Sequence, residues 1–314
     1  MPRLRQPYLP CLGAVLLACA VSHVAAAATL EVGPDRTFKL PSEAMAAAHD
    51  GDTVRIAAGE YFDCATVPQN RLTIEGTGPD ASAILTDKAC GGKGLLITTG
   101  NDITVRNLTL ARARVPDNNA AGIRSEGVNL LVEGVKFIND QDGILANPTP
   151  EGSIIVRDSE FTRNGVCAGG CAHGIYVSAL KLLRIEHSKF SETKQAHHIK
   201  SRAARTEVIG CEISDGPNGT ASYEIDVPNG GALVVRDNII VKGPKSENHT
   251  AMIMIGEEGV TQRTSEITVE NNTARNDGSH STFLVDNQTA TEAVLKGNKL
   301  SGPIQPLLGD GNVE

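Results

Sequence analysis

GIRS at residues 122–125 returns down the chain as GILA at 143–146, GIYV at 174–177, HIKS at 198–201, EIDV at 224–227, MIMI at 252–255 and FLVD at 283–286. The copies lie about 27 residues apart on average, a period typical of stacked structural repeats rather than of one globular core. Residues one period apart then become neighbours in space. The sequence can therefore be read as a set of columns.

A second motif follows most copies: an apolar residue with another apolar residue five positions later. Its pairs are Val105/Leu110, Val132/Phe137, Val156/Phe161, Ile185/Phe190, Val208/Ile213, Val235/Ile240, Val269/Ala274 and Leu295/Leu300. Each repeat thus predicts strands of about 3 to 5 residues, separated by turns rich in Gly, Asn, Asp and Pro. Asn238, Asn272 and Asn298 share one turn position, which predicts a ladder of stacked amides.

The start of the repeat region carries the most specific local signal. PSEAMAAA at 41–48 predicts a short helix, and GDTVRIAAGEYFD at 51–63 with RLTIEGTG at 71–78 predicts two short strands bounded by glycine. This opening unit resembles that of the pectin-lyase-like superfamily. The resemblance implies an all-β fold, a single-stranded right-handed parallel β-helix (a solenoid of about 8 to 10 rungs) with a short N-terminal capping helix. We expect the cap and first rungs at 29–84 and the repeat domain at 85–314.

Composition limits the function. The 314 residues include 3% aromatics and no tryptophan, and the formal net charge is −8. Nucleic-acid binding is not expected, because it requires a basic footprint. An acidic polymer would need a local basic patch instead. We expect a monomer without a membrane span.

The N-terminus predicts a signal peptide over residues 1–28. Arg3 and Arg5 form a basic segment, 11–21 an apolar segment and 25–28 a run of small residues. The apolar segment is too short to span a membrane. Cys19 leaves a lipoprotein cleavage site open as an alternative. We expect export to the periplasm or the extracellular space.

Five cysteines follow this leader: Cys64, Cys90, Cys167, Cys171 and Cys211. In an oxidising compartment, Cys64 with Cys90 and Cys167 with Cys171 are plausible disulfides, which leaves Cys211 as a buried free thiol. A zinc site made of Cys167, Cys171 and His173 is the alternative.

The columns predict which side chains share a face. The inward ladder is Ile123, Ile144, Ile175, Ile199, Ile225, Ile253 and Leu284. The residues after it are Arg124, Leu145, Tyr176, Lys200, Asp226, Met254 and Val285. The residues before it are Gly122, Gly143, Gly174, His198, Glu224, Met252 and Phe283. Because alternate residues of a strand face opposite ways, we expect both neighbours of a ladder residue to point outward.

The middle rungs concentrate the ionisable groups on that outer face: Tyr176, Lys200, Asp226, His198 and Glu224. A histidine, a lysine, a tyrosine and two carboxylates in one patch can supply an acid, a base and charge stabilisation together. The alternative is that Lys200–Asp226 and His198–Glu224 are cross-strand pairs that keep a long sheet soluble.

Further polar residues flank this patch. His173 and His197 precede the same strands, and either line a cleft or fold inward at a turn. Arg202 follows Lys200 and either binds a substrate carboxylate or solvates the bend. Arg124 lies two rungs from Tyr176, about 10 Å away, and is a candidate for a distant substrate subsite.

The leading functional hypothesis is β-elimination of a uronic-acid polysaccharide. Lys200 would be the base, with a pKa lowered by His198 and Arg202, although Asp226 would raise that pKa. Tyr176 or His198 would protonate the leaving oxygen, and Arg202 would hold the carboxylate. IKSR at 199–202 is similar to the lysine-serine strand of some alginate and chondroitin lyases of this fold.

Other functions remain open. Glu224 and Asp226 could bind Ca²⁺, as lyases of this fold often do. They could also form the carboxylate pair of an inverting glycoside hydrolase, and CAHGIYV at 171–177 is similar to a stretch of polygalacturonases. Epimerisation of a uronate needs the same proton removal as elimination. A non-catalytic carbohydrate-binding protein is the hypothesis that involves no enzyme.

Overall fold

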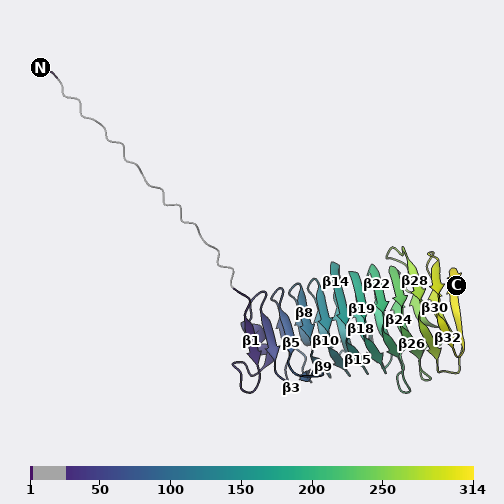
Figure 1. Ribbon diagram of the computed structural model, residues 1–314, viewed down its shortest axis with the longest axis horizontal. Coiled ribbons are helices and arrows are strands. Elements are labelled where there is room, and N and C mark those ends of the chain that lie inside the picture. Colours follow the sequence, from purple (N-terminus) through teal and green to yellow (C-terminus); the bar gives the residue numbers. More distant parts are fainter. Residues whose placement is uncertain (3–25) are drawn as a thin grey trace.

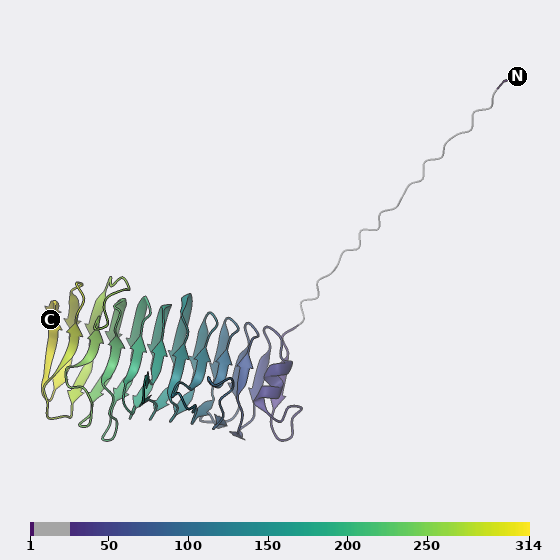
Figure 2. The same ribbon diagram turned by 180° about the vertical axis from the view of Figure 1, so that it is seen from behind.

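The chain winds into a long coil whose successive turns stack along one axis (Figures 1 and 2). The computed structural model describes residues 1–2 and 26–314. The signal peptide predicted at 1–28, with Cys19, falls almost entirely outside the described residues. In the described part, no helix is both long and apolar enough to cross a membrane.

Three long parallel sheets form the sides of the coil. Sheet A contains β1 (Thr29–Val32), β2 (Thr53–Ile56), β5 (Thr73–Gly76), β8 (Ile103–Arg106), β11 (Leu130–Glu133), β14 (Thr149–Arg157), β19 (Leu180–Glu186), β22 (Arg205–Ile209), β25 (Ala232–Arg236), β28 (Ile267–Glu270), β31 (Ala293–Lys296) and β34 (Gly311–Val313). Sheet B contains β3 (Gly59–Tyr61), β6 (Ala83–Thr86), β9 (Thr109–Ala111), β12 (Lys136–Ile138), β15 (Glu160–Thr162), β20 (Lys189–Ser191), β23 (Glu212–Ser214), β26 (Ile239–Lys242), β29 (Thr273–Asn276) and β32 (Lys299–Ser301). Sheet C contains β4 (Ala65–Val67), β7 (Gly94–Thr98), β10 (Ala121–Ser125), β13 (Asp142–Ala146), β18 (Ile175–Val177), β21 (His197–Ser201), β24 (Tyr223–Val227), β27 (Ala251–Ile255), β30 (Thr282–Asn287) and β33 (Ile304–Gly309).

The predicted columns are the observed ladders of the core. The first members of the apolar pairs stack in sheet A, and the second members stack in sheet B. In sheet B, Phe137, Phe161 and Phe190 stack with ring centroids 4.5 Å apart. Such aromatic pairs contribute roughly 0.5–1.5 kcal/mol each beyond the burial of their area. The isoleucine ladder from Ile123 to Ile253 stacks in sheet C.

One predicted register is wrong. Val285, rather than Leu284, pairs with Ile253, and Asp286 pairs with Met254. Leu284 is nevertheless fully buried. The FLVD copy carries two adjacent apolar residues, so its pattern does not decide which of them continues the ladder; the pairing along the backbone does.

The ends and corners of the coil are closed by specific contacts. Helix α1 (Pro41–Ala47) covers the N-terminal end with buried Ala44 and Met45, and Glu43 accepts hydrogen bonds from the backbone N–H groups of Lys39 and Leu40 at 2.9 and 3.2 Å. The bond from Leu40, the N-cap residue, satisfies one of the donors that the start of a helix leaves free.

The cysteines pair as predicted. Cys64–Cys90 and Cys167–Cys171 are disulfides, and Cys211 is a buried free thiol. The second disulfide closes a small antiparallel hairpin, β16 (Val166–Cys167) with β17 (Cys171–Ala172). The expected ladder of asparagines is also present: the amide of Asn238 donates to Asn272 Oδ1, and that of Asn272 to Asn298 Oδ1, both at 2.9 Å.

Candidate functional site

The outer face of sheet C carries a row of three polar side chains on adjacent strands. Tyr176 on β18 pairs in register with Lys200 on β21, which pairs with Asp226 on β24. Lys200 Nζ lies 3.1 Å from Asp226 Oδ2. Asp226 is fully buried, and the Lys200 side chain is only 10% exposed. The row predicted from the sequence is therefore assembled in the fold.

Lys200 and Arg202 together hold the carboxylate of Glu258. Glu258 Oε1 lies 2.7 Å from Lys200 Nζ, and Glu258 Oε2 lies 2.6 Å from Arg202 Nη2. Arg202 Nε also donates to Tyr176 Oη at 3.0 Å, and its guanidinium lies 5.7 Å from the centre of the tyrosine ring. Two cations, one carboxylate and one phenol thus form a connected cluster.

The charges of this cluster fix its protonation. Burial alone would lower the pKa of Lys200, but Asp226 and Glu258 raise it above its ordinary value. Burial alone would raise the pKa of Glu258, but hydrogen bonds from Lys200 and Arg202 lower it. Burial raises the pKa of Asp226 to about 7 despite the opposing charge of Lys200. Lys200 is therefore a cation here, and the lowered pKa that the sequence suggested for it is not found.

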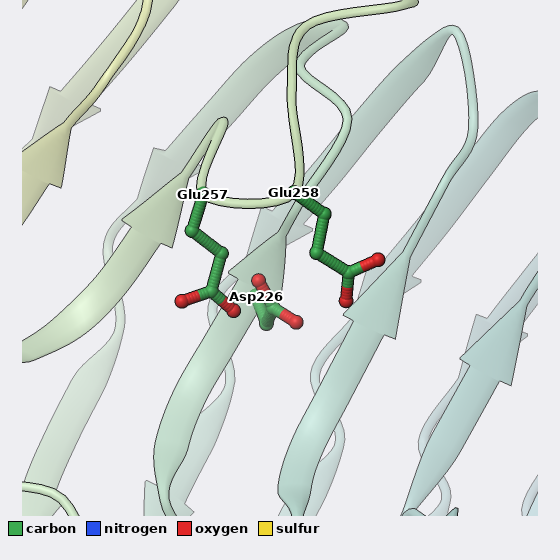
Figure 3. Close-up of side chains that lie close together, drawn as sticks. All are labelled: Asp226, Glu257 and Glu258. Carbon is green, nitrogen blue, oxygen red and sulfur yellow. The ribbon is translucent and has the colours of Figure 1, made fainter.

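Glu257 and Glu258 come from the loop that follows β27. Figure 3 shows both side chains reaching from this loop toward Asp226 on its strand. Tyr223 Oη donates to Glu257 Oε2 at 3.1 Å. One carboxylate oxygen from each of Asp226, Glu257 and Glu258 lies within 4.8 Å of the other two.

A second column, at the start of the same strands, links each rung to the next through a side-chain acceptor. Asp142 Oδ1 accepts the backbone N–H of His173 at 2.6 Å, His173 Nδ1 that of His197 at 3.2 Å, and His197 Nδ1 that of Tyr223 at 3.2 Å. The rings of His173, His197 and Tyr223 stack with centroids 5.0 and 5.1 Å apart. An Nδ1 that accepts a hydrogen bond carries no proton, so neutral rings carry theirs on Nε2.

Both histidines are held neutral by their surroundings. Burial lowers the pKa of His173 well below its ordinary value, and the charges of His197 and Lys200 add to this effect. Burial, followed by the charge of Lys200, lowers the pKa of His197 to about 3. His197 Nε2 lies 3.4 Å from Asp226 Oδ2. His197 therefore borders the row, whereas His173 is buried behind it.

The alternation of the strands predicted that His198 and Glu224 would face outward, and this prediction is wrong. Both are fully buried inside the coil. His198 Nδ1 lies 2.7 Å from Thr193 Oγ1 and its Nε2 lies 3.0 Å from Asp215 Oδ1. Glu224 Oε2 lies 3.3 Å from Lys242 Nζ, and burial raises the pKa of Glu224 to about 8. These residues form an internal polar cluster that is separate from the row.

The physical reason lies in the corner between sheet B and sheet C. On earlier rungs glycine occupies the same position, and a Cβ on Gly122 would lie 2.8 Å from the ring of Phe137, while one on Gly143 would lie 2.7 Å from that of Phe161. The position before the ladder therefore points into the core at this corner. His198 follows the same direction and packs edge-on against Phe190, with centroids 6.4 Å apart.

The remaining predicted site residues have clear positions. Arg124 lies in the same outer column, separated from Tyr176 by Leu145, and donates to Asn147 Oδ1 at 2.9 Å. Glu224 and Asp226 lie on opposite sides of β24, so they neither share a metal ion nor flank one glycosidic bond.

The acidic cluster of Asp226, Glu257 and Glu258 fits a calcium ion poorly. The ammonium of Lys200 lies between Asp226 and Glu258, at 3.1 and 2.7 Å from their oxygens. A divalent cation bound by these two carboxylates would meet that charge directly. Lys200 Nζ already lies at the place where an ion shared by Asp226 and Glu258 would bind.

Sequence reasoning missed Glu257, Glu258 and Asp142. Glu257 and Glu258, in EEG at 257–259, come shortly after the MIMI copy of the repeat, so their position beside the outer face could have been inferred. Its reach back to Lys200, over a sequence separation of 58 residues, could not.

Comparisons with known proteins agree with this architecture. A family model for the right handed beta helix region matches residues 152–306. The structure is similar to an alginate lyase from Paenibacillus sp. str. FPU-7 (TM-score 0.54, 18% identity, 91% of this chain and 99% of that one). It is also similar to YbhC of Escherichia coli (TM-score 0.52, 12% identity, 94% and 88%) and, at a TM-score of 0.45, to a pectin methylesterase from Aspergillus niger (12% identity, 91% and 91%).

The family model and the two structures with TM-scores above 0.5 agree on the fold. The chain folds as a right-handed parallel β-helix. No protein of curated function matches its sequence. Because this fold carries several chemistries, the fold alone does not identify the function.

Proposed function

We propose that this protein is a polysaccharide lyase that cleaves a uronic-acid polymer by β-elimination on the outer face of sheet C. One observation carries the proposal: Lys200 and Arg202 jointly hold a carboxylate, that of Glu258, beside the hydroxyl of Tyr176. A uronate carboxylate in the place of Glu258 would make the same two contacts. The reacting carbon would then lie next to the tyrosine.

The chemistry of elimination requires this set of groups. A base removes the proton on the carbon next to the carboxylate, and the electron pair left behind forms a double bond as the neighbouring carbon–oxygen bond breaks. The departing sugar oxygen takes up a proton. Negative charge develops on the carboxylate during this reaction, and cations placed there beforehand stabilise it.

The contacts support different roles from those the sequence suggested. Lys200 acts as a charged ligand of the carboxylate, because its raised pKa keeps it protonated. Tyr176 moves the proton, since its hydroxyl lies 3.0 Å from Arg202 Nε, beside the place proposed for the carboxylate and the reacting carbon. Asp226 holds Lys200 in position, and His197 contacts Asp226 in turn. His198 and Glu224 stay outside the reacting set because they are sealed in the core.

Two further points bear on this proposal. The disulfides support export to an oxidising compartment, where extracellular polysaccharides are met. The proposed first step, removal of a proton next to a carboxylate, is shared with uronate epimerases. The product therefore distinguishes these two reactions.

The test is a screen of alginate, polygalacturonate and other acidic polysaccharides with two assays. Elimination produces an unsaturated uronate that absorbs ultraviolet light, together with a new reducing end. We expect both signals from the natural protein. Tyr176→Phe and Lys200→Gln should each lower the rate by about 10² to 10⁴, the usual contribution of a proton-transfer group or of a cation at developing charge.

Matched variants serve as controls. Tyr61→Phe removes a hydroxyl in the first rungs, and Lys181→Gln removes a charge on sheet A; both should keep full activity. Reducing ends without absorbance would indicate a hydrolase, and binding without either signal would indicate a carbohydrate-binding protein. Either result overturns the proposal.

A further inference from the structure

A second cluster of cationic side chains lies at the corner between sheet B and sheet C, apart from the row of Tyr176, Lys200 and Asp226. A cavity of about 280 Å³ is formed there by residues from four consecutive rungs, among them Arg114, Gln141, Val166, Lys194 and Gln195. We refer to this cavity as the corner pocket. Its wall includes the start of the hairpin closed by Cys167–Cys171.

Two cations converge in the corner pocket without an acidic partner. Arg114 Nη2 donates to both oxygens of Asn139, the backbone O and Oδ1, at 2.8 Å. Lys194 Nζ donates to the same Oδ1. Among the described residues, no carboxylate lies within ion-pair distance of Arg114 or Lys194, whereas Lys136 and Arg112, on the outer side of sheet B, are both paired with acids. Both cations therefore share a neutral oxygen and form no ion pair, although the carboxyl groups of Asp87 and Asp140 interact with Arg114 from a longer distance.

The remaining groups of the pocket add hydrogen-bond donors. Gln195 Oε1 accepts the backbone N–H of Cys167 at 2.9 Å, which fixes the amide. The NH₂ group of Gln195 has no hydrogen-bond partner within the described part of the chain. Burial, followed by the charges of Arg114 and Arg163, lowers the pKa of Lys194. Crowded positive charge of this kind is relieved when an anion binds.

We infer that the corner pocket binds the carboxylate of an acidic sugar through Arg114, Lys194 and Gln195. The choice of ligand rests on the proposed function, because the same polymer would supply the sugar. Gln195 precedes Lys200 by five residues, so their Cα atoms are at most about 18 Å apart. One oligosaccharide can therefore contact the corner pocket and the row at sheet C together. This second contact would offset the repulsion between an acidic polymer and a protein of net charge −8.

The test measures binding independently of turnover. Isothermal titration calorimetry would follow the binding of hexamers of mannuronate, guluronate and galacturonate, with cellohexaose as a neutral probe and inorganic sulfate as a free anion. For the acidic hexamer that binds best, the double variant Arg114→Gln/Lys194→Gln should weaken affinity at least about tenfold, because two charge-assisted contacts are lost. Binding of disaccharides, which are too short to reach both places, should not change.

A variant with the same loss of charge elsewhere controls for the overall field. Arg236→Gln/Lys299→Gln removes two cations from sheets A and B and should leave affinity nearly unchanged. If the pocket variant lowers the melting temperature, the single change Gln195→Ala supplies the same comparison without a change in charge.

The outcomes separate this inference from the proposed function. Unchanged hexamer affinity in the pocket variant overturns the inference, and so does the absence of binding by every acidic hexamer. If the pocket variant loses binding of sulfate but binds the hexamers as before, the pocket holds only a free anion, and the inference is also overturned. If the pocket variant loses affinity but the natural protein forms no unsaturated product, the inference stands and the proposed lyase activity fails.

Discussion

At the scale of single residues, Glu258 occupies the two cations of the candidate site. Its carboxylate bridges Lys200 and Arg202, the two cations that we propose to receive a uronate. A substrate must displace this internal carboxylate before it can make the same contacts. The energy of that displacement is subtracted from the affinity for the substrate.

We therefore predict that Glu258→Gln lowers KM by about 3- to 10-fold, because the amide releases the two cations at a smaller cost. Steady-state kinetics on the polymer cleaved best would measure this change. Glu257→Gln is the matched control, since it removes the same charge from the same loop but contacts Tyr223 rather than the cations. An increase in KM with Glu258→Gln would contradict the prediction and would mean that the loop helps to bind the substrate.

His197 links the candidate site to pH. Its Nδ1 accepts the backbone N–H of Tyr223, and its pKa is lowered to about 3. In the unfolded chain a histidine has a pKa of about 6.5. Between these two values the unfolded state binds more protons than the folded state. The contribution of His197 to stability is therefore complete above pH 6.5 and is lost as the pH falls toward 3.

The difference in unfolding free energy between the natural protein and His197→Gln should accordingly shrink by about 2 kcal/mol from pH 7 to pH 5. Urea unfolding followed by circular dichroism at the two pH values would measure it. His49→Gln, at an exposed position near the capping helix, is the control and should show no such change. Equal differences at both pH values would mean that His197 takes up protons equally in the folded and the unfolded state, so that folding does not lower its pKa.

At the scale of elements, the glycines before the isoleucine ladder are packing positions. A Cβ on Gly143 would lie 2.5 Å from the carbonyl oxygen of Gly174 and 2.7 Å from the ring of Phe161. The backbone of the next rung and the aromatic stack thus leave no room for a methyl group. The strands of sheet C can come this close to sheet B only because this residue is small.

Gly143→Ala should therefore lower the free energy of unfolding by about 1–3 kcal/mol, the usual cost of overpacking a core. Gly170→Ala in the disulfide hairpin is the control, because nothing lies within 4 Å of a Cβ there, and its effect should stay within about 0.5 kcal/mol. Denaturant titration of both variants would measure the two changes in the free energy of unfolding. Equal stability of the two would show that the corner can expand freely.

At the scale of the whole molecule, the backbone of each rung pairs only with the adjacent rungs in the three long sheets, so stability is largely a chain of local contributions. Two disulfides reinforce this chain unequally. Cys64–Cys90 joins residues 26 apart, whereas Cys167–Cys171 joins residues 4 apart. Chain entropy assigns more stabilisation to the longer loop, about 3.5 kcal/mol against about 2 kcal/mol.

Replacing both Cys64 and Cys90 by serine should therefore destabilise the protein more than replacing Cys167 and Cys171. Hydrogen exchange should also show the loss of protection concentrated in the first rungs, β1 to β7, because solenoids open locally. A uniform loss of protection along the coil would contradict this expectation and would indicate that the whole helix unfolds as one unit.

The sequence by itself determined the coil, the order of its ladders and the members of the outer row. A repeat forces each ladder residue into the same environment, so Ile123 through Ile253 and the paired apolar positions could be placed without coordinates. Tyr176, Lys200 and Asp226 followed, because side chains one period apart lie on adjacent strands.

The tertiary structure alone decided which neighbours of the ladder face the solvent and which distant groups complete the site. His198 and Glu224 turn inward because the chain bends at the corner between sheets B and C, where strict alternation no longer holds. Glu258 reaches Lys200 across 58 residues through a loop that has no period. A repeat in the sequence predicts only the positions that recur on each rung. Asp226 and Glu258 together raise the pKa of Lys200, and the bridge from Lys200 to Arg202, on which the proposed chemistry rests, depends on this contact that occurs once.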